Sequence, residues 1–270
     1  MSDFSKGAEL LLQARLTRQR LPKLPDDCYP GSLSAAYELQ DALTAALLNQ
    51  FGGRQIGYKI ACTNTAAQAF LGLDGPFYGP LLSYQTQPSP ARFNSDSLFM
   101  NVIEPEFAFE MARDLPPQTG DFSREQVAEA VWAILPAIEI VDSRYVDWTT
   151  IGARSLIADQ AAHGAWIRGQ VTTAWREFDL LTHQVELRVN GQVNQTGNGS
   201  VVLGHPLKAL TWLANALNRR GRGLEAGQVI TTGVCIDQVY PAQAGDEVVA
   251  DFGPLGLIEI VLKSDNLPGS

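Results

Sequence analysis

Two acidic residues set one position apart carry the strongest chemical signal in this sequence. Glu104 and Glu106 lie in a run of apolar and aromatic residues that extends from 103 to 109. In an extended strand alternate side chains share a face, so both carboxylates point into one space. Two like charges in a poorly hydrated place are costly unless a cation or a proton compensates them. We therefore expect a divalent metal ion beside them.

A third acid lies in similar surroundings. Glu139 interrupts an apolar, β-branched run over residues 135–141, which is typical of a buried strand. Three carboxylates suit Mg²⁺ or Mn²⁺ and leave coordination positions open for water or substrate. The alternative is that these acids form structural ion pairs with Arg144, Arg113 or Lys59. The metal site is favoured because each of three buried acids would otherwise need a partner of its own.

Two further residues could take part in proton chemistry. Lys59 lies between Tyr58 and Ile60 in a predicted strand, where its ammonium could bind a carboxylate or shuttle a proton. The alternative is an edge-strand lysine that prevents aggregation. His163 ends a segment of small and polar residues, 155–164, that could line a pocket. It is either a general base or a structural histidine.

The composition excludes several other classes of function. The 270 residues carry a net charge of −9 with a pI near 4.8, which offers no attraction for nucleic acid or an anionic membrane. Three widely spaced cysteines argue against a disulfide framework or a zinc site. The N-terminus has no signal-peptide core and no apolar run is long enough to cross a bilayer, so we expect a cytoplasmic protein. The motifs of serine hydrolases, P-loop NTPases and dinucleotide enzymes are absent.

The periodicity of the chain predicts the elements that position these residues. Residues 1–52 form an N-terminal helical region that Gly52 ends, and residues 53–270 form a second domain of short strands and turns, in which all the candidate site residues lie. Asn190-Gly191 marks a hairpin. Frequent strands without βαβ alternation predict an α+β fold with a mostly antiparallel sheet or open barrel.

Two local predictions concern segments near the acids. Ser123 opens a capping box, and we expect its helix to run through Ile134 until Pro136 closes it. The Gly- and Pro-rich residues 72–80 are expected to form a loop that could act as a lid.

Several motifs together resemble one enzyme group. The sequence is similar, from about residue 10 to residue 262, to the 2-oxopent-4-enoate hydratase and 4-oxalocrotonate decarboxylase group of the fumarylacetoacetase superfamily. The segments that carry the resemblance occur in the same order in both: Gly57-Tyr58-Lys59, Leu71-Gly72-Leu73-Asp74, Ile103-Glu104-Pro105-Glu106, Ala137-Ile138-Glu139-Ile140-Val141-Asp142-Ser143-Arg144, Ile157-Ala158-Asp159, the hairpin from Asn190 to Gly197, and Leu203-Gly204-His205-Pro206.

The resemblance implies a fold, a cofactor and an assembly. The implied fold is a mixed β-roll with an N-terminal helical part, and the implied assembly is a homo-oligomer; the charge balance given above argues against nucleic-acid or membrane partners. The residues implied at the site are the metal ligands Glu104, Glu106 and Glu139 for Mg²⁺ or Mn²⁺, the catalytic residues Lys59 and Asp159, and the substrate-binding residues Arg144, Leu73 and Asp74.

The implied substrate is a small anionic 2-oxo or 2-hydroxy acid. The resemblance indicates a 2-hydroxy-2,4-dienoate from aromatic meta-cleavage catabolism, to which the enzyme adds water. A related decarboxylase, an acylpyruvate-type hydrolase and a non-catalytic paralogue remain alternatives. The family commonly shows Gly-Leu-Thr-Ser after the lysine strand and Asp-Asn after Ile-Ala, where this chain has Ala61-Cys62-Thr63-Asn64 and Asp159-Gln160. These segments border the substrate, so they affect its identity more than the metal chemistry.

Overall fold

A computed structural model describes residues 4–264 of the chain. The ends of the two predicted regions, residues 1–3 and 265–270, lie outside this part. The α-helices in it are α1 Phe4–Thr17, α2 Leu33–Phe51, α3 Thr65–Leu71, α4 Arg124–Glu129, α5 Ala153–Ala158 and α6 Pro206–Asn218. None of the helices described is long and apolar enough to cross a membrane.

The strands form two sheets within residues 4–264. An eight-stranded sheet has the order β2-β1-β10-β5-β6-β7-β3, with β11 also paired to β5, and a five-stranded sheet has the order β4-β13-β12-β8-β9. The strands are β1 Gln55–Ala61, β2 Phe77–Leu82, β3 Thr86–Pro88, β4 Ala91–Asn94, β5 Val102–Met111, β6 Val131–Val141, β7 His163–Arg168, β8 Gln184–Val189, β9 Gln192–Asn198, β10 Val229–Val234, β11 Tyr240–Pro241, β12 Glu247–Asp251 and β13 Leu257–Lys263.

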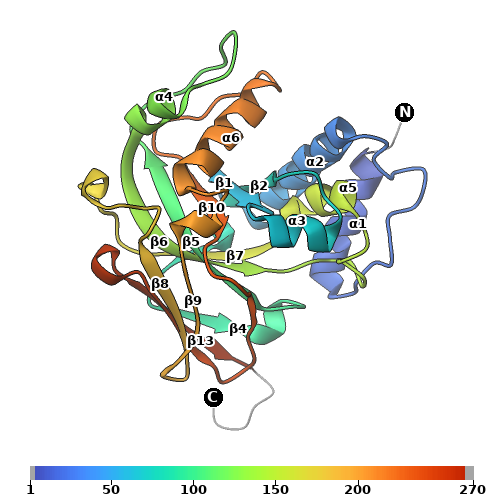
Figure 1. Ribbon diagram of the computed structural model, residues 1–270. Helices are drawn as coiled ribbons and strands as arrows, with labels where there is room; N and C mark the ends of the chain where they lie inside the picture. Colours follow the sequence, from blue (N-terminus) through green and yellow to red (C-terminus); the bar gives the residue numbers. More distant parts are fainter. Residues whose placement is uncertain (1–3, 265–270) are drawn as a thin grey trace.

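The predicted α+β fold with a mostly antiparallel sheet is confirmed. Among the described strand pairs, only β1 with β10, β3 with β7 and β4 with β13 run parallel. Figure 1 shows the larger sheet curling around the middle of the molecule, with the smaller sheet below it and α6 across the front of β10. The β8–β9 hairpin follows the Asn190-Gly191 prediction.

The N-terminal helices lie together at one side of the larger sheet, close to α3 and α5 (Figure 1). Helix α2 begins after Ser32, whose hydroxyl accepts a hydrogen bond from the Ala35 amide at 3.1 Å, and ends at Gly52 with a φ of 74°. Leu11 of α1 and Leu43 of α2 are fully buried in one cluster with side chains from β2 and α5. The division of the chain at residue 52 stays a prediction.

The helix predicted from Ser123 to Ile134 is wrong in its second half. The capping box is present, but α4 ends at Glu129, and Val131 begins strand β6, which continues through Pro136. This strand is paired on both sides, with β5 and with β7. The Pro136 carbonyl accepts a hydrogen bond from the Gly169 amide, just beyond the end of β7, so the proline keeps this contact although it has no N–H to donate.

The predicted loop over residues 72–80 is shorter than expected. Phe77 begins β2, which pairs with β1 along its length, so only residues 72–76 are turns between α3 and the sheet. Gly79 lies in this strand where an added Cβ would come within 2.5 Å of the Gln160 carbonyl oxygen. The glycines of this segment therefore serve two purposes: some form the turn, and Gly79 allows the β2 backbone to approach that of Gln160.

Candidate metal centre and active site

Two neighbouring strands bring the predicted acids together. Glu104 and Glu106 lie on β5, and Glu139 lies on β6 directly opposite Glu104. One carboxylate oxygen from each residue lies within 4.8 Å of those of the other two. Like charges at opposed positions of a sheet are destabilising on their own. The arrangement therefore gathers negative charge at one point of the sheet.

The curl of the sheet adds Lys59 to this group. Lys59 lies on β1, which is separated from β6 by β10 and β5. In a flat sheet β1 and β6 would be about 14 Å apart, three strand spacings, with their side chains parallel. Here the Lys59 ammonium lies 3.1 Å from Glu139 Oε1 and is 2% exposed. The curl of the sheet thus brings two distant strand positions into one site.

Several carboxylate oxygens are already engaged. Glu106 Oε2 accepts hydrogen bonds from the Thr231 hydroxyl and, at 2.9 Å, from the Gly233 amide. Glu139 Oε1 accepts from Lys59 and from His163 Nδ1, the latter at 2.8 Å. Within the described chain, Glu106 Oε1 and Glu139 Oε2 are buried without a hydrogen-bond partner. Two unsatisfied acceptors beside a third acid indicate that a ligand is required here.

The electrostatics of the cluster are unbalanced. Burial, followed by repulsion from Glu139, raises the pKa of Glu104 to about 7 and raises that of Glu106 well above its usual value. Burial acts against ionisation of Glu139 too, but the Lys59 ammonium and His163 outweigh it and lower its pKa. Burial opposes the charge on Lys59, yet the three carboxylates prevail and raise its pKa. Lys59 therefore stays protonated at neutral pH.

The donor set fits a hard divalent cation. Three carboxylates against one ammonium leave two uncompensated negative charges when all are ionised. Carboxylate oxygens are the ligands that Mg²⁺ and Mn²⁺ prefer. The unpartnered oxygens of Glu106 and Glu139 supply acceptors that nothing else in the described residues satisfies. Glu104, Glu106 and Glu139 are thus the residues that would hold the ion.

A strained tripeptide fixes the other side of Lys59. The backbone of Gln160, Ala161 and Ala162 is left-handed throughout, with φ between 52° and 57°, and all three residues are buried. Such a conformation is unfavourable for residues other than glycine and persists only when its surroundings enforce it. The Ala161 carbonyl accepts a hydrogen bond from the Lys59 ammonium at 2.8 Å. The tripeptide therefore positions the lysine from outside the sheet.

A cavity of about 600 Å³ opens beside this cluster. Glu104 and Lys59 form part of its wall, whereas Glu106 and Glu139 are fully buried. Gly233 also lines it, with a φ of 97°, and an added Cβ there would collide with the side chain of Thr63. The chain can thus present the Gly233 amide to Glu106 only with glycine at this position.

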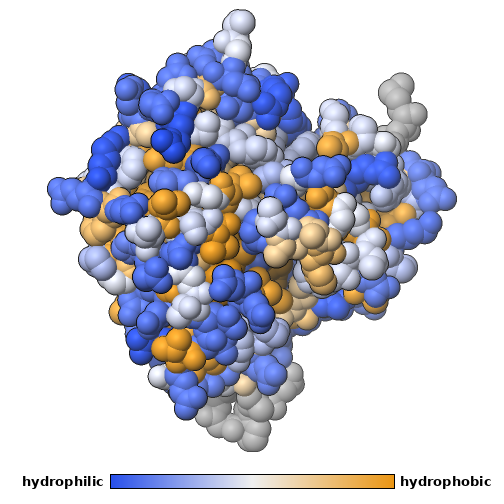
Figure 2. Space-filling view, in the orientation of Figure 1, coloured by the Kyte–Doolittle hydropathy of each residue, from blue (hydrophilic) through white to orange (hydrophobic). Residues whose placement is uncertain are grey.

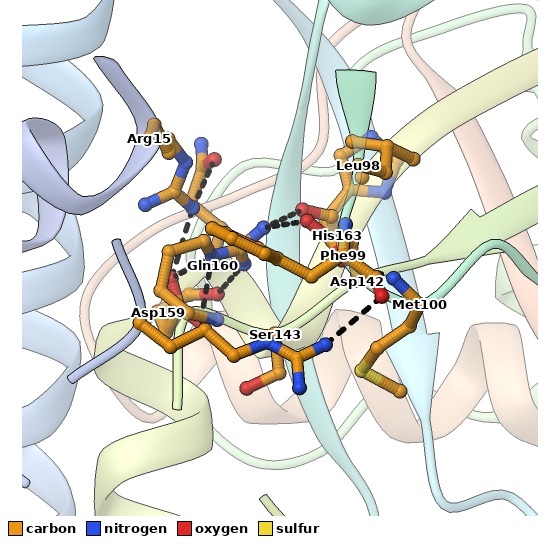
Figure 3. Close-up of polar contacts among 12 residues, drawn as sticks. Arg15, Leu98, Phe99, Met100, Asp142, Ser143, Asp159, Gln160 and His163 are labelled. Atoms are coloured by element: carbon orange, nitrogen blue, oxygen red, sulfur yellow. Dashed lines mark hydrogen bonds and ion pairs between the residues drawn. The ribbon is translucent and has the colours of Figure 1, made fainter. Parts of the chain in front are cut away.

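Arg144 and Asp159 lie in a separate network rather than in this cavity. Figure 3 shows how the residues around them converge from α1, the end of β6 and the end of α5. Arg144 Nε donates to Asp159 Oδ1 at 2.7 Å, and its Nη1 donates to Asp142 Oδ2 at 3.2 Å. Arg15 of α1 lies 3.0 Å from Asp159 Oδ1. The predicted catalytic role of Asp159 and substrate role of Arg144 are not supported by contact with the cavity.

The remaining predicted contacts lie elsewhere. Leu73 and Asp74 line a second cavity of about 740 Å³, together with Tyr37 and Arg154. Leu71 borders both cavities, so the turn after α3 separates them. The structure therefore does not bring these two residues to the carboxylate cluster.

Sequence reasoning missed some partners of the acids. His163 had no evident partner in the sequence, whereas in the structure it donates to Glu139, and burial lowers its pKa so that it is neutral. Thr231 and Gly233, both on β10, were not singled out. The detectable signal was a pair of threonines and a glycine inside a strand that is otherwise apolar and fully buried.

The chain belongs to the fumarylacetoacetate (FAA) hydrolase C-terminal family, whose model matches residues 95–262. A 2-keto-4-pentenoate hydratase from Burkholderia vietnamiensis (strain G4 / LMG 22486) is 32% identical over 248 residues, covering 91% of this chain and 93% of that protein. A 4-oxalocrotonate decarboxylase from Pseudomonas sp. (strain CF600) is 30% identical over 245 residues, 91% of each chain.

A solved structure matches nearly the whole chain. It is 4-oxalocrotonate decarboxylase from Pseudomonas putida G7, complexed with magnesium and adipate, with a TM-score of 0.88 and 28% identity over 96% of this chain and 97% of that one. A second structure of the same enzyme is complexed with calcium and acetate. The resemblance stated from the sequence is therefore confirmed, and divalent metals occur in these neighbours.

Proposed function

We propose that this protein is a metal-dependent hydro-lyase that adds water to a 2-hydroxy-2,4-dienoate such as 2-hydroxypenta-2,4-dienoate. The observation that carries the proposal is the cluster of Glu104, Glu106 and Glu139, in which Glu104 lines a cavity and the buried Glu106 and Glu139 each keep an unsatisfied oxygen. Full-length hydratase relatives support the type of reaction. The product would be 4-hydroxy-2-oxopentanoate.

The residues around the cavity have distinct roles in the proposed reaction. A bound Mg²⁺ or Mn²⁺ would act as a Lewis acid that stabilises negative charge on the 2-oxygen of the substrate. Lys59, held protonated by the surrounding carboxylates, provides a fixed positive charge for the substrate carboxylate and a proton donor at the cavity wall. Glu139 and the Ala161 carbonyl hold that ammonium in place. The rest of the cavity wall is mostly apolar.

A decarboxylase is the second candidate, because the solved structure with a TM-score of 0.88 is a decarboxylase. The two reactions use the same electron sink at the 2-oxo group and differ at the distal carbon. A homo-oligomeric state and a cytoplasmic location also remain proposals, based on the resemblance and the sequence.

The test is to incubate the purified protein with Mg²⁺ or Mn²⁺ and, separately, 2-hydroxypenta-2,4-dienoate and 2-oxohex-3-enedioate. We expect mass spectrometry to detect the first compound with one water added and the second unchanged. Loss of CO₂ from the second compound would identify a decarboxylase instead. Conversion of neither, with metal bound, would reject both candidates.

A further inference from the structure

The cavity is much larger than the reacting part of the proposed substrate. 2-Hydroxypenta-2,4-dienoate has eight heavy atoms, which fill at most about 240 Å³ if each takes the share of a water molecule in the liquid. The cavity measures about 600 Å³. More than half of it therefore stays free when a five-carbon acid occupies the end beside Glu104 and Lys59.

The free part of the cavity is mostly apolar, with Asn64, Asp237 and Gln238 as the polar exceptions. Away from Lys59 and Glu104, its wall is formed largely by Phe70, Leu71, Trp148, Leu156 and Val239. The rings of Phe70 and Trp148 lie 6.3 Å apart, in a tilted arrangement. Contiguous apolar surface of this kind typically binds an apolar group.

The charges of the wall disfavour a second anionic group. Among the described residues that line the cavity, Lys59 is the only cation, and its ammonium already contacts Glu139 and the Ala161 carbonyl. The wall also carries Glu104 and Asp237. A carboxylate at the far end of a substrate would lose water without gaining a cationic partner, which is costly.

Helix α3 is only partly covered by the described protein. No residue of α3 is buried, and Phe70 is 65% exposed. Figure 2 shows apolar surface over α3 beside a hollow in this face of the molecule. The helix is nevertheless anchored, because Asn64 caps it and the Gln68 side chain donates to the Cys62 carbonyl at 2.8 Å. The helix is thus fixed in place, while most of the Phe70 side chain stays exposed beside the cavity.

We propose that α3 and Trp148 form a subsite for an alkyl or aryl substituent on the distal carbon of the substrate. The inference rests on the proposed function for the reacting end of the site. It makes the preferred substrate a 2-hydroxydienoate with one carboxylate and an apolar tail. Burial of each additional methylene group should tighten binding about threefold to fourfold.

The test uses saturated 2-oxo acids, which can bind but cannot be hydrated. Isothermal titration calorimetry with Mg²⁺ compares 2-oxobutanoate, 2-oxopentanoate, 2-oxohexanoate and 2-oxooctanoate. We expect the affinity to rise about threefold per methylene along this series. The dicarboxylate 2-oxohexanedioate should bind at least about tenfold more weakly than 2-oxohexanoate, because its second charge has no partner.

Variants locate the subsite. Phe70→Ala should flatten the chain-length dependence while leaving the affinity for 2-oxobutanoate unchanged, and Phe70→Leu should keep most of the dependence. The matched control is Phe51→Ala, because Phe51 is 44% exposed on α2 and lies outside this cavity. It should leave the whole series unchanged.

Each other outcome overturns the inference. Equal affinity along the series would remove the apolar subsite while leaving the proposed reaction in place. An unaltered series in Phe70→Ala, with a changed oligomeric state, would mean that a second copy covers α3. Failure of every acid to bind, including 2-oxobutanoate, would reject the proposed function together with the subsite.

Discussion

Two buried polar clusters lie side by side in this protein and differ in their charge balance. In the first, Glu104, Glu106 and Glu139 face a single ammonium, that of Lys59. In the second, the two aspartates Asp142 and Asp159 face the two arginines Arg15 and Arg144. The second cluster is neutral as it stands, and the first is not. A buried cluster that cannot neutralise itself indicates a place for an ion from outside.

The two clusters also differ in how completely their polar side chains are hydrogen-bonded. Arg144 also donates to the carbonyls of His163 and Asp159, both at 3.0 Å, so every nitrogen of its guanidinium has a partner. Burial and the nearby Arg144 lower the pKa of Arg15 to about 10, which leaves it charged at neutral pH. The first cluster keeps two carboxylate oxygens without partners in the described residues. We infer that the arginine network is structural and the glutamate cluster functional.

The largest expected effect comes from a change in the unbalanced cluster. Glu106→Gln removes one charge from the metal-binding trio and should lower kcat/KM at limiting Mg²⁺ by about a thousandfold, because transition-state charge loses its stabilisation. Circular dichroism should show an intact fold. Glu110→Gln, on the same strand but paired with Arg168, is the matched control. Unchanged turnover of Glu106→Gln at low metal would contradict the assignment.

A change in the balanced cluster should act on stability instead. Asp159→Asn leaves the buried Arg144 without its main counter-charge and should lower the free energy of unfolding by about 3 kcal/mol. Urea denaturation measures this loss. The affinity of the folded variant for Mg²⁺ should stay close to that of the unchanged protein. If the Asp159→Asn protein is stable but inactive, Asp159 is a catalytic residue instead.

Adding metal should also distinguish the two clusters, through a smaller change in the stability of the folded protein. At a concentration one hundred times its Kd, Mg²⁺ should stabilise the folded protein by about 2.7 kcal/mol. For a chain of this size the melting temperature should then rise by about 5 °C or more. Differential scanning calorimetry should show the rise in Asp159→Asn and little of it in Glu106→Gln. Equal shifts in both variants would place the metal elsewhere.

The strand spacing of the acids could be predicted from the sequence because it depends on local geometry. Alternation along β5 placed Glu104 and Glu106 on one face, and the apolar run around Glu139 predicted a buried strand. The pairing of Glu139 with Glu104 and the approach of Lys59 depend on strand order and curl, which no local pattern encodes.

The errors have physical causes of the same kind. The capping box at Ser123 is real, but pairing of β6 with two neighbours overrides the helical pattern through Pro136. The roles of Arg144 and Asp159 stay predictions; how α5 meets β6 sets the direction of their side chains, which contact each other. Sequence identifies ionisable residues that are costly to bury, but tertiary packing decides which of them reach a ligand.

The left-handed tripeptide has a consequence for how this enzyme can be studied. The group that meets the Lys59 ammonium there is the main-chain oxygen of Ala161, which no amino-acid replacement removes. The neighbouring Gln160 side chain accepts from Arg15 at 3.2 Å, so α1 is connected to the lysine through one turn of backbone. An alanine scan of the side chains would therefore not detect this contact. Substitutions in α1, which is distant in sequence, would lower activity without an evident cause.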